Sequence, residues 1–231
     1  MKKSFFTLLL GLGVAFGANI QTLTQQCEAN NAKACYDLSV AYFNGKGVPT
    51  NQKKAFELVQ KACDLGSAKG CSVVGVFYEK GAEWNSGVAK DSSKVFAFAK
   101  KACDMGDAEG CFNLGIVYEK GTGVAKDSSK AFAFYKKACD MGDALGCNNV
   151  GFLYSNGKGV AKDSSKAFSF AKKACDMGMA QACHDVGSYY YYGTGVKKDI
   201  NAAKNYSKKA CSMGEQKGCD NYKIMLRQGG R

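Results

Sequence analysis

The sequence predicts an all-α fold, a solenoid of stacked αα hairpins stapled by disulfides. Three observations support this prediction. All twelve cysteines fall into six pairs with the same C-x7-C spacing, and the first members of successive pairs lie 36 residues apart, with one step of 40. A fixed period of this length indicates a repeat architecture. Between the pairs, amphipathic helical patterns alternate with glycine turns, and the chain has a single proline, Pro49.

Residues 1–17 have the features of a signal peptide. Lys2 and Lys3 precede an apolar run, and Ala15-Phe16-Gly17 is a small-x-small cleavage site. The apolar run, about a dozen residues, is shorter than a membrane-spanning helix needs. We therefore expect a secreted or periplasmic protein without a stable membrane anchor, in an oxidising compartment that lets cysteines pair. We also expect it to be a monomer.

Residues 18–231 are interpreted as a single α-solenoid domain. A terminal half-unit at each end is expected, because the outermost faces of a stacked array must be soluble. Residues 18–31 are the N-terminal half-unit, and residues 216–231 are a polar C-terminal cap. The five full repeats between them are 32–67, 68–107, 108–143, 144–179 and 180–215.

Each repeat is expected to contain two helices. The first carries a Leu/Val-Gly-x-x-Tyr pattern, as in Val150-Gly151-x-x-Tyr154. Glycine inside a helix costs about 1 kcal/mol relative to alanine, so its recurrence predicts a helix crossing closely there. A Gly-x-Gly-Val loop then leads to an aspartate such as Asp163, which can cap the second helix. In that helix Ala131, Tyr135 and Ala138 share one face.

The segment between paired cysteines is predicted to be a tight corner. A glycine three residues after the first cysteine suits a left-handed helix end, as at Gly106. Asp107 is then a good N-cap, whereas Met179 and Glu215 in the last two copies are weaker ones. The two cysteines thus lie one turn either side of the corner, within reach of a disulfide. The expected disulfides are Cys27–Cys35, Cys63–Cys71, Cys103–Cys111, Cys139–Cys147, Cys175–Cys183 and Cys211–Cys219.

Metal binding is the alternative for paired cysteines. Zinc sites use closer spacings with a second pair or histidines nearby, and this chain has one histidine, His184. We therefore expect neither a metal nor a cofactor. A zinc-dependent hydrolase is excluded on the same ground.

The second repeat carries four extra residues in its loop, which contains the chain's single tryptophan, Trp84. Loops accept insertions at little cost, so a neutral insertion and a partner-contacting loop both remain open.

The formal charge is +12, and Lys-Lys pairs at one position of the second helix contribute much of it. Such charge can attract acidic glycans or lipid phosphates. Lysines repeated at one helical position are more simply a solvated ridge. Nucleic acid is not an expected partner for an exported protein.

The whole pattern resembles the Sel-like repeat, a relative of the tetratricopeptide repeat. Adding C-x7-C to every unit behind a signal peptide is similar to the Helicobacter cysteine-rich proteins. This resemblance implies secreted, disulfide-bridged αα solenoids that bind penicillins, are classed as slow β-lactamases and engage host immune responses. It supplies no catalytic motif to place on this chain.

Serine β-lactamases use an S-x-x-K motif, and the chain contains two matches, Ser155–Lys158 and Ser169–Lys172. Two matches are expected by chance in so lysine-rich a chain, and no K-T-G follows. His184 has a pKa range suited to a general base, but no orienting partner is visible in the sequence. The catalytic residues therefore remain unknown.

Certain positions of the first helix vary among the five repeats, whereas the second helix begins with a nearly identical sequence in three of them. By analogy with tetratricopeptide arrays, they line a concave binding groove, although exposed positions free to drift give the same pattern. The last repeats are richest in amides and aromatics. The candidate ligand-binding residues are Asn148, Phe152, Asn156, His184, Tyr191 and Tyr192.

Two functions remain open. One, which the resemblance alone implies, is a slow β-lactam hydrolase, taking β-lactam or peptidoglycan-like small molecules. The other is a non-enzymatic scaffold that binds proteins or glycans of a host or the cell envelope in the groove.

Overall fold

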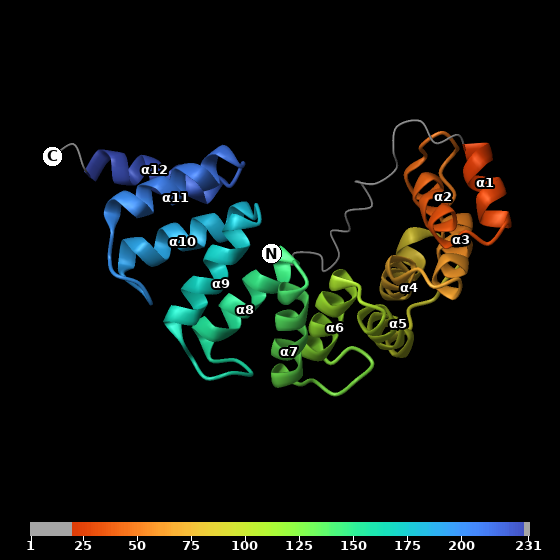
Figure 1. Cartoon of the computed structure of the whole chain (residues 1–231), viewed down its shortest axis with the longest axis horizontal. Coiled ribbons are helices and arrows are strands. Elements are labelled where there is room, and N and C mark those ends of the chain that lie inside the picture. The colour runs from red at the N-terminus through yellow and green to blue at the C-terminus, as the bar shows by residue number, and fades with distance from the viewer. Residues whose placement is uncertain (1–19, 229–231) are drawn as a thin grey trace. The chain divides into compact units, whose positions relative to one another are not determined.

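The computed structural model describes residues 20–228 (Figure 1), and the predicted signal peptide lies outside this range. Within it the chain forms α-helices, one 3-10 helix and no β-strand. The all-α repeat fold predicted from the sequence is thus confirmed. The chain divides into two compact units, one ending at Lys126 and the other beginning at Asp127.

Unit 1 holds the first six α-helices and the 3-10 helix, and unit 2 holds the remaining six α-helices. The helices of unit 1 are α1 (Ile20–Glu28), α2 (Ala32–Asn44), α3 (Gln52–Asp64), α4 (Ala68–Lys80), η1 (Gly81–Trp84), α5 (Ser92–Asp104) and α6 (Ala108–Lys120). The helices of unit 2 are α7 (Ser128–Asp140), α8 (Ala144–Asn156), α9 (Ser164–Asp176), α10 (Ala180–Tyr192), α11 (Ile200–Ser212) and α12 (Gln216–Gln228).

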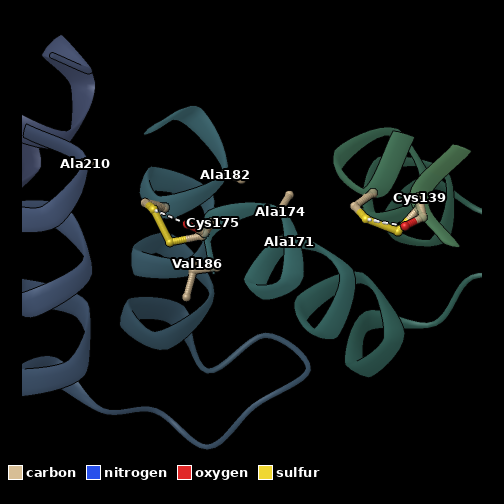
Figure 2. Packing of buried hydrophobic residues seen from close by; sticks show 9 residues of the cluster. Cys139, Ala171, Ala174, Cys175, Ala182, Val186 and Ala210 are labelled. Carbon is tan, nitrogen blue, oxygen red and sulfur yellow. Dashed lines mark hydrogen bonds between the residues drawn. A yellow bond between two sulfur atoms is a disulfide. The ribbon is translucent and has the colours of Figure 1, made fainter. Parts of the chain in front are cut away.

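Within each unit, every helix packs on the next one along the chain. Small residues bring the helices of unit 2 close together: Ala171 and Ala174 of α9 face Ala182 and Val186 of α10 in one buried cluster (Figure 2). The predicted helix face of α7 is also buried, since Tyr135 and its alanine neighbours are almost fully inaccessible to solvent. No helix in the described range is long and apolar enough to cross a membrane.

The predicted N-caps are present. The carboxylate of Asp163 accepts a hydrogen bond from the Lys166 backbone N–H at 2.9 Å, and Asp107 accepts one from Gly110 at 2.8 Å. Met179 makes no such bond with its side chain, as expected for a side chain without an acceptor. These caps fix where each helix begins.

The corners between paired cysteines adopt the predicted geometry. In the second corner Gly66 has a φ of +94°, its N–H donates to the Cys63 carbonyl, and the Ser67 N–H donates to the Ala62 carbonyl. This pair of hydrogen bonds is a Schellman motif, and it satisfies carbonyls at the helix end. The chain therefore reverses within a few residues.

Disulfides bridge all six corners, with Cα–Cα distances from 4.3 to 4.6 Å. Each joins the second helix of one repeat to the first helix of the next, so the staples connect successive repeats. No group of three or more His, Cys, Asp or Glu side chains in the described part of the chain is placed to hold a metal. Six disulfides fit an oxidising extracellular or periplasmic environment.

The glycine loops set the spacing of the repeats. A Cβ on Gly195 would lie 2.0 Å from the carbonyl oxygen of Ser164, the first residue of α9, and Gly159 makes the same approach to Ser128 at 2.1 Å. No side chain fits in such a gap. The loops of Gly159 and Gly195 therefore rest directly on the start of the second helix of the preceding repeat.

The four-residue insertion forms η1 and fills space in unit 1. The Trp84 ring packs edge-on against Phe43 and Phe77, with centroid distances of 4.8 and 5.0 Å. Trp84 therefore belongs to the aromatic packing of this unit, which favours the packing role over that of a partner-contacting anchor.

Candidate functional site

The main candidate site is a hollow of about 520 Å³ in unit 2, between α8 and α10. Its walls combine carboxamides, hydroxyls and aromatic rings, and only Asp185 among its lining residues carries a charge. We call this hollow the α8–α10 groove. It is lined by Asn148, Asn149, Gly151, Phe152, Ser155, Ala171, Asp185, Ser188, Tyr189, Tyr192 and Thr194.

The groove opens because of the residues at one variable position. In α4 and α6 of unit 1 that position holds Val76 and Ile116, which are buried. In α8 and α10 it holds Phe152 and Ser188. Phe152 is 57% exposed and Ser188 is too small to fill the space, so the gap between the two helices stays open.

Three of the six candidate ligand-binding residues, Asn148, Phe152 and Tyr192, line the α8–α10 groove. Tyr191 and Tyr192 line a second hollow of about 150 Å³ toward α12, together with Asn221. Tyr192, 74% exposed, stands between the two hollows. The structure thus brings four of the six residues to two adjoining hollows.

The remaining two residues lie outside both hollows. The Asn156 amide donates to the Phe152 carbonyl at 2.7 Å and so closes the end of α8. His184 has partners that sequence reasoning missed: its Nδ1 lies 3.0 Å from the Asp185 carboxylate and its Nε2 lies 3.1 Å from the Asn221 amide nitrogen. Since both ring nitrogens are engaged, His184 connects α10 to α12.

Several lining residues were not identified as ligand-binding candidates from the sequence. Asn149, Asp185 and Tyr189 each lie one residue from a position that varies between repeats, so a wider window around those positions would have included them. Burial raises the pKa of Tyr189, with a smaller contribution from Asp185, while a hydrogen bond with Ser155 opposes the rise. The phenol is therefore protonated at neutral pH.

The two S-x-x-K matches do not form serine–lysine pairs of the kind that hydrolases use. Ser155 lies in the last turn of α8, and Gly157, with a φ of +66°, ends that helix before Lys158. The Ser169 hydroxyl donates to the Ser165 carbonyl at 3.0 Å. The hydrogen bond that Lys172 donates to the Asp176 carboxylate raises the pKa of Lys172, which is the wrong direction for a general base.

Tyr154, the tyrosine of the Val150-Gly151-x-x-Tyr154 pattern in α8, is a packing residue. Its ring meets Phe132 edge-on at a centroid distance of 5.1 Å and stacks on Phe170 at 5.8 Å. Tyr190 repeats this arrangement between Phe168 and Tyr206. The recurring tyrosine thus holds the second helices of successive repeats together.

The Lys-Lys pairs interact with their own repeat array. The first lysine of a pair bonds an aspartate four residues later, as Lys172 does with Asp176 at 2.8 Å. The second reaches the preceding corner: Lys173 Nζ donates to the Cys139 carbonyl at 3.3 Å, and Lys209 Nζ donates to that of Cys175 at 3.5 Å. Lys61, which follows a glutamine at the same position of α3, makes the same bond to the Cys27 carbonyl at 2.8 Å. Part of the positive charge therefore serves packing between repeats.

In unit 1 side chains at the corresponding variable positions make polar contacts within the unit. The Ser72 hydroxyl donates to the Asp107 carboxylate, and Glu79 of α4 lies 3.9 Å from Lys120 of α6. Burial raises the pKa of Glu79 and lowers that of Lys120. Because Ser72, Glu79 and Lys120 already have partners within unit 1, unit 2 is the better candidate for ligand binding.

Comparison with known proteins identifies the repeat. The family model for the Sel1 repeat matches residues 32–67, 68–107, 108–143, 144–179 and 180–215, which together make up more than half of the chain. The chain belongs to the Sel1 repeat family. These five Sel1 matches coincide with the ranges over which the sequence repeats.

Solved structures of Sel1-type proteins have the same fold. A protective antigen of uropathogenic Escherichia coli matches with a TM-score of 0.83 and 26% identity, covering 92% of this chain and 45% of the antigen. A Sel1 repeat protein from Oxalobacter formigenes matches with a TM-score of 0.76 and 24% identity over 86% of this chain and 79% of its own. Helicobacter pylori cysteine rich protein B is 34% identical, over 60% of this chain and 97% of its own, with a TM-score of 0.45.

Curated relatives match a shorter stretch. Cytochrome c oxidase assembly factor 7A of Xenopus laevis is 38% identical over 56 residues, 24% of this Sel1 chain and 24% of the relative. The chain thus spans about a quarter of the length of the curated relatives it matches.

Proposed function

We propose that this Sel1 repeat protein is a non-enzymatic, protein-binding scaffold whose α8–α10 groove receives an extended polypeptide segment. The observation that carries the proposal is the pairing of two exposed rings, Phe152 and Tyr192, with the carboxamides of Asn148 and Asn149 in one open groove.

Each part of the groove matches a part of a peptide. Exposed aromatic rings supply large apolar contact area at little cost in side-chain entropy, which is why aromatics are enriched at binding hot spots. A carboxamide both donates and accepts hydrogen bonds, as the peptide main chain does. An apolar side chain of the partner would insert between Phe152 and Tyr192 while Asn148 and Asn149 hold its backbone.

The family supports a protein partner. Sel1 repeats generally mediate protein–protein interaction. The curated relatives are named as assembly factors, and their similarity covers a limited stretch of both chains. A glycan or another small molecule would use the same rings and amides, and binding experiments distinguish these occupants from a peptide.

The chemistry of the groove favours binding over hydrolysis. A serine nucleophile needs a base that takes its proton. Ser155 is hydrogen-bonded to Tyr189, whose pKa is raised, so this partner holds its own proton at neutral pH. His184 does not line the groove, and its two ring nitrogens are engaged with Asp185 and Asn221.

The test is selection of peptides from a random displayed library with the oxidised protein, followed by affinity measurements on variants. Phe152→Ala and Tyr192→Ala are expected to weaken a selected peptide by roughly ten-fold or more, the range of interface hot spots. The matched control is Leu145→Ala, which removes a side chain of α8 that is 47% exposed and does not line the groove. Equal affinities for all four proteins would contradict the proposal.

The second experiment measures hydrolysis of a chromogenic β-lactam by the oxidised protein. We expect turnover no greater than that of a mock-purified control. Turnover above the control that disappears in Ser155→Ala or His184→Ala would overturn the non-enzymatic proposal and identify a residue of a hydrolase.

A further inference from the structure

Methionine occupies the same place in four of the six corners, two residues after the first cysteine. At three of these corners the methionine thioether contacts the disulfide of the preceding corner. The Sδ of Met105 is 3.9 Å from Cys71 Sγ, that of Met177 is 3.8 Å from Cys147 Sγ, and that of Met213 is 4.0 Å from Cys183 Sγ. The contact recurs at these three corners and joins residues 30 or 34 positions apart.

The two partners of each contact differ in access to solvent. Met105 is 38% exposed, and Met177 and Met213 are each 37% exposed, whereas the three cysteines they touch are fully buried. A reagent that approaches the corner from solvent can therefore reach the thioether, and the disulfide lies behind it.

We propose that Met105, Met177 and Met213 are oxidation sites that intercept two-electron oxidants, of the hypohalous acid and peroxide class, before these attack the disulfides beneath. With hypochlorous acid the thioether sulfur loses two electrons and gains an oxygen atom to become a sulfoxide. The chlorine accepts the two electrons and leaves as chloride, together with a proton. The sulfoxide is the reversible level of methionine oxidation.

The position of these methionines makes the oxidation tolerable to the fold. A sulfoxide is polar and disrupts a core when it forms inside one. At the corners the new oxygen can face water, because more than a third of each side chain is already exposed. Met225, which is 4% exposed, has no such outlet and is an internal reference for a buried thioether.

The chain also provides a corner without the thioether. Leu65 takes the equivalent place in the second corner and packs on the cluster that contains Cys27 and Cys35. Leucine therefore fills this position as an apolar cover, and what methionine adds is the reactive sulfur. The Cys27–Cys35 disulfide is the unprotected reference.

The test is titration of the oxidised full-length protein with hypochlorous acid, followed by peptide mass spectrometry. Sulfoxide is expected at Met105, Met177 and Met213 before Met225 reacts and before any cysteine sulfonate forms. Cys27–Cys35 is expected to be lost before the buried disulfides of the methionine-covered corners. Sulfonate at the methionine-covered corners before sulfoxide at their methionines would overturn the proposal.

Two reciprocal variants distinguish protection by the reactive sulfur from shielding of the disulfide by any apolar side chain. Met177→Leu is expected to raise sulfonate formation at Cys139–Cys147 several-fold relative to Cys175–Cys183 in the same molecule. Leu65→Met is expected to lower sulfonate formation at Cys27–Cys35. Met225→Leu is the control and is expected to leave sulfonate formation at every disulfide as in the unaltered chain. If neither reciprocal variant changes its own disulfide, the methionines are packing residues and the proposal is wrong.

Discussion

The carbonyl oxygen of Ala167 in α9 lies 3.1 Å from the point where a Cβ on Gly151 of α8 would sit, and the Ala171 nitrogen lies 3.3 Å from it. The two helices of this repeat therefore meet backbone to backbone. In α4 the equivalent Gly75 has more room, since its nearest neighbour would be the Phe98 Cβ at 3.5 Å. Gly75 and Gly151 stand at the same position of the repeat, but the space available for a Cβ is larger at Gly75 than at Gly151.

Gly151→Ala is expected to destabilise the protein. Alanine favours a helix by about 1 kcal/mol over glycine, but overpacking at a backbone contact typically costs about 1–3 kcal/mol, so the unfavourable contribution prevails. Gly75→Ala is the matched control and is expected to be neutral or stabilising by up to about 1 kcal/mol. Urea unfolding of both variants checks this, and equal midpoints would contradict the packing argument.

Removing one corner staple is expected to lower stability without changing the helix content. Closing a loop of this length is worth roughly 2.5 kcal/mol in the chain-entropy model. In a Cys175→Ala, Cys183→Ala double variant, amide hydrogen exchange should speed up in α9 and α10. Unchanged exchange there would indicate that packing alone holds the corner.

Lysines that reach across corners are also expected to contribute. Lys61→Met keeps the aliphatic stem but removes the hydrogen bond to the Cys27 carbonyl, a loss of about 0.5–1.5 kcal/mol. Lys53→Met removes an exposed lysine from the same helix and serves as the control. The comparison is made by thermal unfolding, and a Lys61 variant as stable as the Lys53 variant would show that the bond contributes nothing.

Much of the fold was predictable because it depends on local residue chemistry that repeats. The left-handed glycine at Gly66, the cap at Asp163 and the pairing of Cys63 with Cys71 each follow from spacings within one corner or loop. Repetition turns each weak local signal into a strong one, since the same residues recur at the same offset.

The candidate site was less predictable because it depends on contacts between repeats. Val76 and Phe152 occupy equivalent positions, yet one is buried and the other is 57% exposed, and neither fact follows from the pattern alone. The partners of His184 illustrate the same limit. Asp185 is the neighbour of His184 in sequence. Asn221 lies on α12, in the C-terminal half-unit, and comes near His184 only because α12 stacks on α10.

A partly buried tyrosine in unit 1, Tyr36, gives the protein a measurable alkaline pH dependence. Burial raises the pKa of Tyr36 from 10.0 to about 12, and the negative charges of Glu109, Asp37 and Asp107 add to the rise. The folded state thus holds the phenol proton more tightly than the unfolded state does. The resulting stability is fully present below pH 10 and is lost as the pH rises toward about 12, because only the unfolded chain releases the proton in that window.

The Tyr36→Phe variant lacks this contribution, so the free energy of unfolding of the variant should fall less steeply between pH 10 and about 12 than that of the unaltered protein. Urea unfolding at several pH values tests this, with Tyr192→Phe, at an exposed position, as the control; parallel curves for the unaltered protein and Tyr36→Phe would contradict the prediction.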